Sequence, residues 1–190
     1  MAKVAEILKK SEKLNLTDWN AMNIATVSPD NMPSSRMVLL KKINDDGLAF
    51  YTNFNSRKGQ DLAENNFIAV NFWWRELQEQ IRIEGEVEKL PAAKSDEYFN
   101  SRPLKSRVAA IVSQQSEKIV SYEILQKEID ELTKQFELKK ENPARPEHCG
   151  LYLVKPNSIE LWKEGDFRTH HRQKFVKKED KTWKSYFLSP

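Results

Sequence analysis

The chain has one cysteine, five glycines and three histidines among its 190 residues. The lone Cys149 excludes an internal disulfide, and one cysteine with three histidines gives no cluster of zinc-binding spacing. No stretch approaches the roughly 20 apolar residues that a membrane-spanning helix needs. Residues 1–14 alternate apolar and charged side chains without an apolar run of signal-peptide length. These absences predict a cytoplasmic protein with no metal site and no membrane partner.

Motifs of several large enzyme classes are also missing. The sequence contains no GxSxG, no Walker loop, no HExxH and no strand-GxGxxG-helix. Five glycines are too few to assemble a glycine-rich cradle for a phosphate easily. A phosphate site in this chain would therefore be built from side-chain cations and hydroxyl groups.

The composition is that of a folded domain, since 39% of the residues are hydrophobic and 10% are aromatic. Lysine and arginine number 31 against 28 acidic residues, and this net charge of +3 is too small to indicate a nucleic-acid partner. The sequence contains no repeat and no interdomain linker. We expect a helical segment at residues 1–18 and a single domain at residues 19–190.

Hydrophobic periodicity predicts strands at both ends of the chain and helices in the middle. The clearest strand is 80–88, where apolar and charged residues alternate with period two. Hairpin-length turns between consecutive strands favour an antiparallel sheet, and about eight strands favour a barrel in a mainly β protein with helices, an α+β fold. Strands are predicted at 21–28, 34–41, 48–52, 67–74, 80–88, 151–154, 158–162, 168–176 and 182–188. Helices are predicted at 3–14, 56–65, 91–102 and 108–112, with a longer one capped by Ser116.

Two clusters of cations lie near predicted strand ends. In the first, Arg36 and Lys41 bracket an apolar strand. In the second, Tyr51 and Thr52 precede Arg57 and Lys58, which lie at a predicted helix start, where the helix dipole favours an anion. Taken alone, an Arg-Lys pair is more often a solvated helix face.

Two further clusters carry the other unusual residue combinations. Residues 98–107 gather aromatic residues, hydroxyl groups and three cations around Pro103, which suits a second phosphate, although a core Tyr98 beside a surface Arg102 is the simpler interpretation. The fourth cluster is Trp162 with residues 167–172. On a strand, Arg168, His170 and Arg172 would share one face as a cationic wall, or simply form a polar surface strand.

Seven strings in order carry a resemblance to a known family. They are RMVLLK at 36–41, YTN at 51–53, SRKG at 56–59, QIRIEG at 80–85, YFNSRP at 98–103, SQQS at 113–116 and RTHHR at 168–172. Together they resemble the pyridoxine/pyridoxamine 5′-phosphate oxidase family, whose fold is an antiparallel FMN-binding split β-barrel with surrounding helices. The resemblance runs from about Trp19 to Pro190, and it makes the segment 1–18 a candidate lid over the substrate.

The resemblance implies an FMN-dependent oxidase of the pyridoxine biosynthesis pathway. Such an enzyme converts pyridoxamine or pyridoxine 5′-phosphate to pyridoxal 5′-phosphate, with hydride transfer to the flavin and reduction of O2 to H2O2. It further implies a homodimer with FMN at the interface. The implied FMN-binding residues are Arg36, Met37, Val38, Leu39, Leu40, Lys41, Tyr51, Thr52, Arg57, Lys58, Gln80, Gln115, Ser116, Trp162 and Arg172. The implied substrate-binding residues are Lys41, Tyr98, Arg102, Ser106, Arg168 and His170, of which Arg168 and His170 would be catalytic.

Two alternatives stay open at this level. One is an FMN oxidase of the same fold that acts on another substrate, such as a phenazine-pathway intermediate. The other is a non-catalytic protein that carries a flavin or pyridoxal phosphate. The sequence does not indicate whether pyridoxine phosphate or pyridoxamine phosphate is the preferred substrate.

Overall fold

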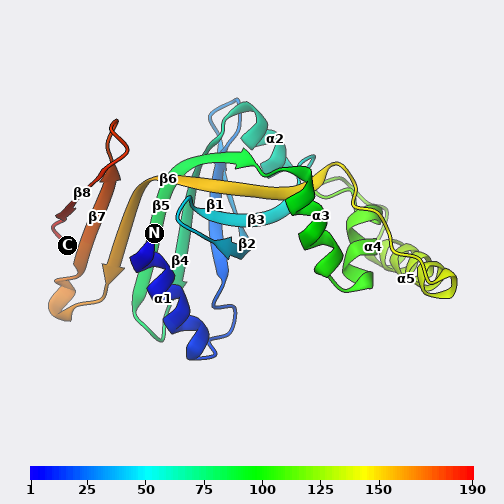
Figure 1. Cartoon of the computed structure of the whole chain (residues 1–190), viewed down its shortest axis with the longest axis horizontal. Helices are drawn as coiled ribbons and strands as arrows, with labels where there is room; N and C mark the ends of the chain where they lie inside the picture. The colour runs from blue at the N-terminus through cyan, green and yellow to red at the C-terminus, as the bar shows by residue number, and fades with distance from the viewer. The chain divides into compact units, whose positions relative to one another are not determined.

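The computed structural model describes residues 1–190 and contains eight strands and five α-helices (Figure 1). The strands are β1 (Ala21–Val27), β2 (Pro33–Ile43), β3 (Leu48–Asn53), β4 (Phe67–Trp74), β5 (Glu79–Lys89), β6 (Cys149–Lys163), β7 (His171–Lys177) and β8 (Trp183–Phe187). The helices are α1 (Ala2–Lys13), α2 (Arg57–Glu64), α3 (Ala92–Ser101), α4 (Leu104–Val112) and α5 (Tyr122–Lys139). A short 3-10 turn, η1, covers Asp166–Arg168.

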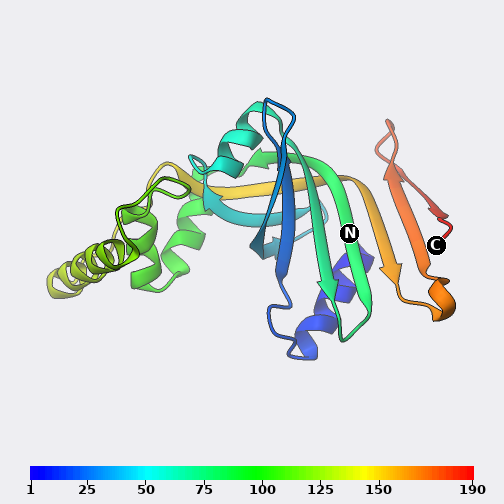
Figure 2. The ribbon, with the colours of Figure 1, turned by 180° about the vertical axis from the view of Figure 1, so that it is seen from behind.

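The strands form one sheet in the order β3-β2-β1-β4-β5-β6-β7-β8. An additional pairing of β3 with β6 closes the first six strands into a barrel, and β7 and β8 extend the sheet beyond β6 (Figure 2). Strands β4 and β5 pair antiparallel without interruption from Phe67 opposite Glu86 to Trp74 opposite Glu79. The predicted antiparallel barrel with helices is therefore confirmed.

Compact packing divides the chain into two units, each described here by itself. The barrel unit comprises Met1–Phe50, Asp61–Glu88 and Leu153–Pro190. Its core consists of the inward side chains of the alternating strands, with Met22, Ile24, Phe72 and Ile81 completely buried. Such alternation is what a sheet with one buried face requires. The helical unit comprises Tyr51–Gln60 and Lys89–Tyr152.

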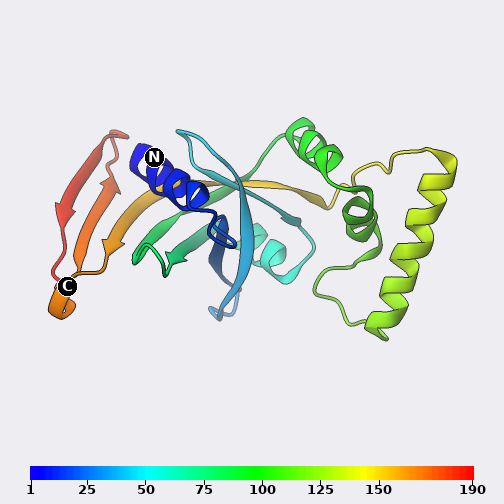
Figure 3. The same ribbon diagram turned by 90° about the horizontal axis from the view of Figure 1, so that it is seen from below.

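Within the helical unit, α4 and α5 lie side by side (Figure 3). Lys105 of α4 and Asp130 of α5 form an exposed ion pair of 2.6 Å. Arg145, in the loop after α5, donates to the Asp96 carboxylate at 2.7 Å and to the Cys149 carbonyl oxygen at 2.6 Å. This arginine therefore connects α3 to the start of β6.

Helix α1 packs on the barrel unit through one apolar face. Val4 and Leu8 are buried, as the helical spacing of apolar residues predicts. On its polar side, Lys10 contacts Glu79 at 3.0 Å, and Lys3 donates to Gln173 at 2.8 Å. None of the helices combines the length and the apolarity that crossing a bilayer requires.

Two predicted boundaries are wrong. The cap of α5 is Ser121, whose hydroxyl accepts from the Ile124 N–H at 3.2 Å, and not Ser116, which has a φ of 79° and lies in a turn. The predicted separation of strands 151–154 and 158–162 is wrong, because Pro156 and Asn157 lie inside β6, a single strand of 15 residues. Pro156 precedes the β6–β7 ladder, which begins at Ser158, so that ladder does not use the missing N–H.

Candidate functional site

The helical unit contains a cluster of polar side chains around the ammonium group of Lys58, which is only 8% exposed. The Lys58 Nζ donates to Ser56 Oγ at 2.9 Å, to Gln115 Oε1 at 2.9 Å and to Thr52 Oγ1 at 3.2 Å. These four residues are called the Lys58 cluster below. These three hydrogen bonds hold the ammonium group of Lys58 at the start of α2. Such an arrangement favours an anionic ligand.

Local structure explains why the cluster forms at this point of the chain. Ser56 Oγ donates to the Asn53 carbonyl at 2.7 Å and closes the turn between β3 and α2. A Cβ at position 59 would overlap the carbonyl oxygen of Phe54, so glycine is required for this tight helix start. The Arg57 N–H donates to Ser116 Oγ at 3.2 Å, which brings the 113–116 turn to the N-terminus of α2. Helix start and cations therefore coincide, as predicted.

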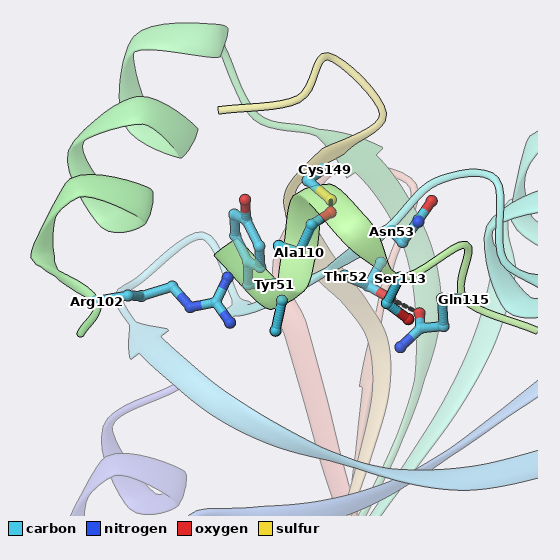
Figure 4. Close-up of a pocket in the computed structure, with 9 residues that line it drawn as sticks. Tyr51, Thr52, Asn53, Arg102, Ala110, Ser113, Gln115 and Cys149 are labelled. Atoms are coloured by element: carbon cyan, nitrogen blue, oxygen red, sulfur yellow. Dashed lines mark hydrogen bonds between the residues drawn. The ribbon is translucent and has the colours of Figure 1, made fainter. Parts of the chain in front are cut away.

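A pocket of about 280 Å³ lies beside this cluster in the same unit (Figure 4). Thr52 and Gln115 line it together with Tyr51, Arg102 and Cys149. The Arg102 guanidinium carbon lies 5.3 Å from the centre of the Tyr51 ring, a cation–π contact. With Ser113 and Asn53, which also line it, the pocket is bordered by one guanidinium group, three hydroxyl groups and two amides.

The hydroxyl of Tyr51 is buried and makes no hydrogen bond of standard geometry within the protein. Burial raises the pKa of Tyr51 above its usual value, and Cys149 adds to the rise while Arg102 and Arg145 oppose it. Burial likewise raises the pKa of the Cys149 thiol, against the same two arginines. Both groups therefore stay neutral near pH 7, and Tyr51 can donate a hydrogen bond to a ligand.

The other predicted residues of this unit lie on α3 and α4. The Tyr98 ring is 4.9 Å from the Tyr51 ring, so Tyr98 and Arg102 both contact Tyr51. Ser106 lies in the first turn of α4, where its N–H donates to the Pro103 carbonyl at 3.0 Å. Of the predicted cluster at residues 98–107, Tyr98 and Arg102 therefore lie beside Tyr51, and its suggested role in holding a second phosphate stays a prediction.

In the barrel unit, Arg36 is the centre of a second polar cluster. Its guanidinium donates to Thr26 Oγ1 at 2.7 Å and to Ser34 Oγ at 2.5 Å, and it lies 4.0 Å from the buried Asp61 carboxylate. Asp61 Oδ2 in turn accepts from Thr26 Oγ1 at 2.6 Å. The rest of the predicted string continues along β2: Met37 and Leu39 are exposed, Val38 is half-buried, Leu40 is buried, and a register shift between Leu40 and Lys42 leaves Lys41 at a bulge.

A third cluster forms around Trp162 on β6. The Trp162 ring lies 4.6 Å from the His170 ring and 5.8 Å from the Trp73 ring. Arg172 faces Trp162 in the β6–β7 ladder, and Gln80 faces Trp73 in the β4–β5 ladder. Trp162, His170 and Arg172, which belong to the fourth cluster of the sequence analysis, therefore lie together, with His170 outside β7.

The predicted strand face shared by Arg168, His170 and Arg172 is wrong. Strand β7 begins at His171, and Arg168 ends the η1 turn, where Phe167 and Arg168 have φ values of 52° and 65°. Two consecutive non-glycine residues in the left-handed region are costly, and such strain is often found at functional sites. The turn is closed by the Thr169 N–H, which donates to the Asp166 carbonyl at 2.9 Å. Arg168 is thereby presented to solvent.

Sequence reasoning missed two acidic residues of these clusters, Asp61 beside Arg36 and Glu160 beside Arg172. Glu160 is 5% exposed and accepts from Arg172 Nε at 2.7 Å. The local pattern of a helix or a strand does not reveal a carboxylate whose partner lies on another element. The nearest signal is an acidic residue, Glu160, between the apolar Ile159 and Leu161 of a strand.

The closed antiparallel barrel, extended by β7 and β8, places this chain among the α+β barrel proteins. Residues 8–136 match the family model described as pyridoxamine 5′-phosphate oxidase. Residues 150–190 match a model described as the pyridoxine 5′-phosphate oxidase C-terminal dimerisation region. The chain belongs to the pyridoxine/pyridoxamine 5′-phosphate oxidase family, and its fold is the split barrel that the sequence resemblance implies.

Individual relatives agree with this assignment. The chain is 49% identical over 175 residues to a pyridoxine/pyridoxamine 5′-phosphate oxidase of Nostoc punctiforme, which covers 92% of this chain and 81% of the relative. It is 44% identical to the corresponding protein of Actinobacillus succinogenes, over 96% of this chain and 85% of that one. Among solved structures, PhzG from Burkholderia lata, in complex with tetrahydrophenazine-1-carboxylic acid, has a TM-score of 0.93 and 26% identity over 100% of this chain and 91% of that chain.

Proposed function

We propose that this chain is an FMN-dependent oxidase that converts pyridoxamine or pyridoxine 5′-phosphate to pyridoxal 5′-phosphate. The observation that carries the proposal is the buried Lys58 ammonium at the start of α2, where it donates to Ser56, Gln115 and Thr52. A phosphate group supplies the negative charge that this arrangement favours. Family membership indicates which phosphates to test first.

The residues present fit FMN. Lys58 and Arg57 lie where a helix N-terminus adds partial positive charge, and the Tyr51 hydroxyl lines the pocket beside them. When bound, FMN would supply the redox chemistry, which is hydride removal from the C4′ carbon and reduction of O2 to H2O2. The residues proposed to hold it are Arg36, Met37, Val38, Leu39, Leu40, Lys41, Tyr51, Thr52, Arg57, Lys58, Gln80, Gln115, Ser116, Trp162 and Arg172.

The protein's own part in the reaction is binding and orientation. Lys41, Tyr98, Arg102 and Ser106 would hold the substrate phosphate through cations and hydroxyl groups. Arg168 and His170 would hold the pyridine ring with its oxidisable carbon toward the cofactor, and the Arg168 charge would stabilise negative charge that develops in the transition state. No acid or base of the hydrolase type is needed for this scheme.

The proposed assembly is a homodimer, supported by the match of residues 150–190 to a dimerisation region. Sedimentation analysis of the purified protein measures the mass in solution. A species of twice the 22.3 kDa chain mass is the expected result. A monomer that retains full activity would contradict the assembly.

The test of the function begins with colour. Protein saturated with FMN and freed of excess ligand should be yellow, with flavin absorbance near about 450 nm. Under air, adding pyridoxamine or pyridoxine 5′-phosphate should release H2O2 and pyridoxal 5′-phosphate. Protein that stays colourless would overturn the proposal, and FMN binding without H2O2 release would instead favour a non-catalytic carrier.

A second candidate function is oxidation of a phenazine-type substrate, supported by the similarity to PhzG along the whole chain. The relatives at 44–49% identity favour the phosphorylated pyridines. Parallel turnover measurements with pyridoxine phosphate and an unphosphorylated reduced tricyclic substrate separate the two. Faster turnover of the tricyclic substrate would favour the second candidate.

A further inference from the structure

We propose that Glu160 is a positioning residue whose buried carboxylate fixes the direction in which Arg172 presents its guanidinium group to FMN. The inference rests on the proposed function, in which Arg172 contacts the cofactor. Glu160 lies on β6, the strand next to the β7 strand that carries Arg172, and acts on the cofactor through Arg172.

The geometry around Glu160 is that of a shared anion. Its Oε1 accepts from Arg172 Nε at 2.7 Å, and its Oε2 lies 3.5 Å from Arg82 Nη1. The side chain is only 6% exposed, whereas Arg82 is half exposed. A buried carboxylate is costly unless cations and hydrogen bonds satisfy it. Glu160 is therefore held from two sides, by β5 and by β7, and cannot turn away from Arg172 without losing both partners.

Arg172 is fixed from a second direction by the last residues of the chain. Its Nη1 donates to the Ser189 carbonyl at 3.0 Å, and its own carbonyl accepts from the Leu188 N–H at 3.0 Å. With Nε on Glu160 and Nη1 on Ser189, the remaining guanidinium nitrogen, Nη2, is the one that these contacts leave for a ligand. Because a guanidinium group is planar, two fixed nitrogens determine the position of the third.

A small cavity, which Glu79 also lines, lies next to Arg172. Arg172, Trp162 and Phe187 border a cavity of about 220 Å³ in the barrel unit. Trp162 lies directly opposite Arg172 in the ladder. The hydrogen bond to Glu160 raises the pKa of Arg172, so the group keeps its full charge at any working pH. What Glu160 determines is therefore the orientation of Arg172 and not its protonation.

A double-mutant cycle tests this inference. Glu160→Gln preserves the shape of the side chain but removes the charge that both arginines share. Titration of apoprotein with FMN, followed by quenching of flavin fluorescence, should show affinity about tenfold lower, the loss expected for one charge-assisted contact. In an Arg172→Ala background, Glu160→Gln should change the FMN affinity less than twofold. Glu160 acts on FMN through Arg172, so its effect disappears when Arg172 is absent.

The matched control is Glu84→Gln, which removes an exposed carboxylate lying 3.7 Å from Lys174 on the same pair of strands. It should leave FMN affinity unchanged. If Glu160→Gln does not fold, the same double-mutant cycle is carried out with Glu160→Asp. This variant keeps the negative charge but moves it away from Arg172, because the side chain is shorter. A thermal melt of each apoprotein separates lost stability from lost orientation.

The outcomes distinguish this inference from the proposed function. Wild-type protein that does not bind FMN contradicts the proposed function, and the inference fails with it. Wild-type protein that binds FMN, with equal losses from Glu160→Gln in the presence and absence of Arg172, retains the function and assigns Glu160 a structural role only. That second result overturns the inference.

Discussion

The cations of the barrel unit and those of the helical unit are held in opposite ways. In the barrel unit, Arg172 and Arg36 each lie beside a buried carboxylate, Glu160 at 2.7 Å and Asp61 at 4.0 Å. In the helical unit, the Lys58 ammonium is held by hydroxyl and amide oxygens. A carboxylate partner fixes the direction of a cation and offsets part of its charge, whereas a hydrogen bond to a hydroxyl or amide oxygen fixes position without itself offsetting charge. The comparison predicts that Lys58 contributes most to FMN affinity and that the arginines contribute mainly orientation.

Removing the Lys58 charge should give the largest effect. Lys58→Met is expected to weaken FMN binding about 100-fold, because a buried charge-assisted contact to phosphate contributes on the order of 3 kcal/mol. The apoprotein should not lose stability in proportion, since the variant also removes the cost of burying an ammonium group. Fluorescence titration and a thermal melt measure the two quantities. The control is Lys105→Met, which removes an exposed lysine of the same unit. An equal loss of FMN affinity in this variant would contradict the special role of Lys58.

The next largest effects should separate cofactor binding from turnover. Arg57→Ala is expected to weaken FMN binding about tenfold with little change in kcat at saturating FMN, because Arg57 lies at the helix start and not beside the substrate. Arg168→Ala should do the reverse and lower kcat/KM about tenfold or more at unchanged FMN affinity. Steady-state kinetics and FMN titration on both variants test the assignment, and equal effects on both quantities would contradict it.

Asp61→Asn should have a smaller effect, about fivefold on FMN affinity, because Arg36 keeps its contacts to Thr26 and Ser34 after the carboxylate is lost. The exposed Glu64 lies in the same helix, so Glu64→Gln is the matched control and should change nothing. A loss for Asp61→Asn as large as that for Lys58→Met would contradict the distinction between direction and charge.

The smallest effect at pH 7 is expected from Tyr51→Phe, and it should appear in the pH dependence of stability. Burial raises the pKa of Tyr51, so the folded protein keeps its proton at pH values where the unfolded chain, with a tyrosine pKa of about 10, loses it. Above about pH 10 the unfolded state therefore binds fewer protons, and the free energy of unfolding falls as the pH rises. The Phe variant lacks this contribution.

Chemical denaturation of both proteins from roughly pH 8 to pH 11, a range that brackets the titration of tyrosine in the unfolded chain, measures this difference in stability. Above about pH 10 the free energy of unfolding should fall more steeply for the wild type than for Tyr51→Phe. Below that pH the two stability curves should run parallel. The exposed Tyr122 provides a control, since Tyr122→Phe should follow the wild type. If the stability curves of the wild type and of Tyr51→Phe run parallel over the whole pH range, burial of Tyr51 does not make stability depend on pH.

The sequence predicted the regular elements well because their signals are local. Strand β5 follows from strict alternation, and α2 follows from a helix start with its cations. The failures depend on contacts between distant residues. Ser116 has the local signal of a cap, but its hydroxyl is used by the Arg57 N–H, and Ser121 caps α5 instead.

The same reasoning applies to the sites. Lys58 and Arg57 can be proposed as a pair from the sequence because one short segment carries both residues. Asp61 and Glu160 were not, since each meets its arginine only after the sheet has formed. The left-handed pair Phe167 and Arg168 was also unpredictable, because neither residue type signals a positive φ.

The single cysteine has a practical consequence. Cys149 is 3% exposed, and burial raises its thiol pKa, so little thiolate is available to react with a maleimide. The native sequence therefore serves as its own background for site-directed labelling. A cysteine introduced on β8, whose residues are all exposed, would therefore be labelled ahead of Cys149.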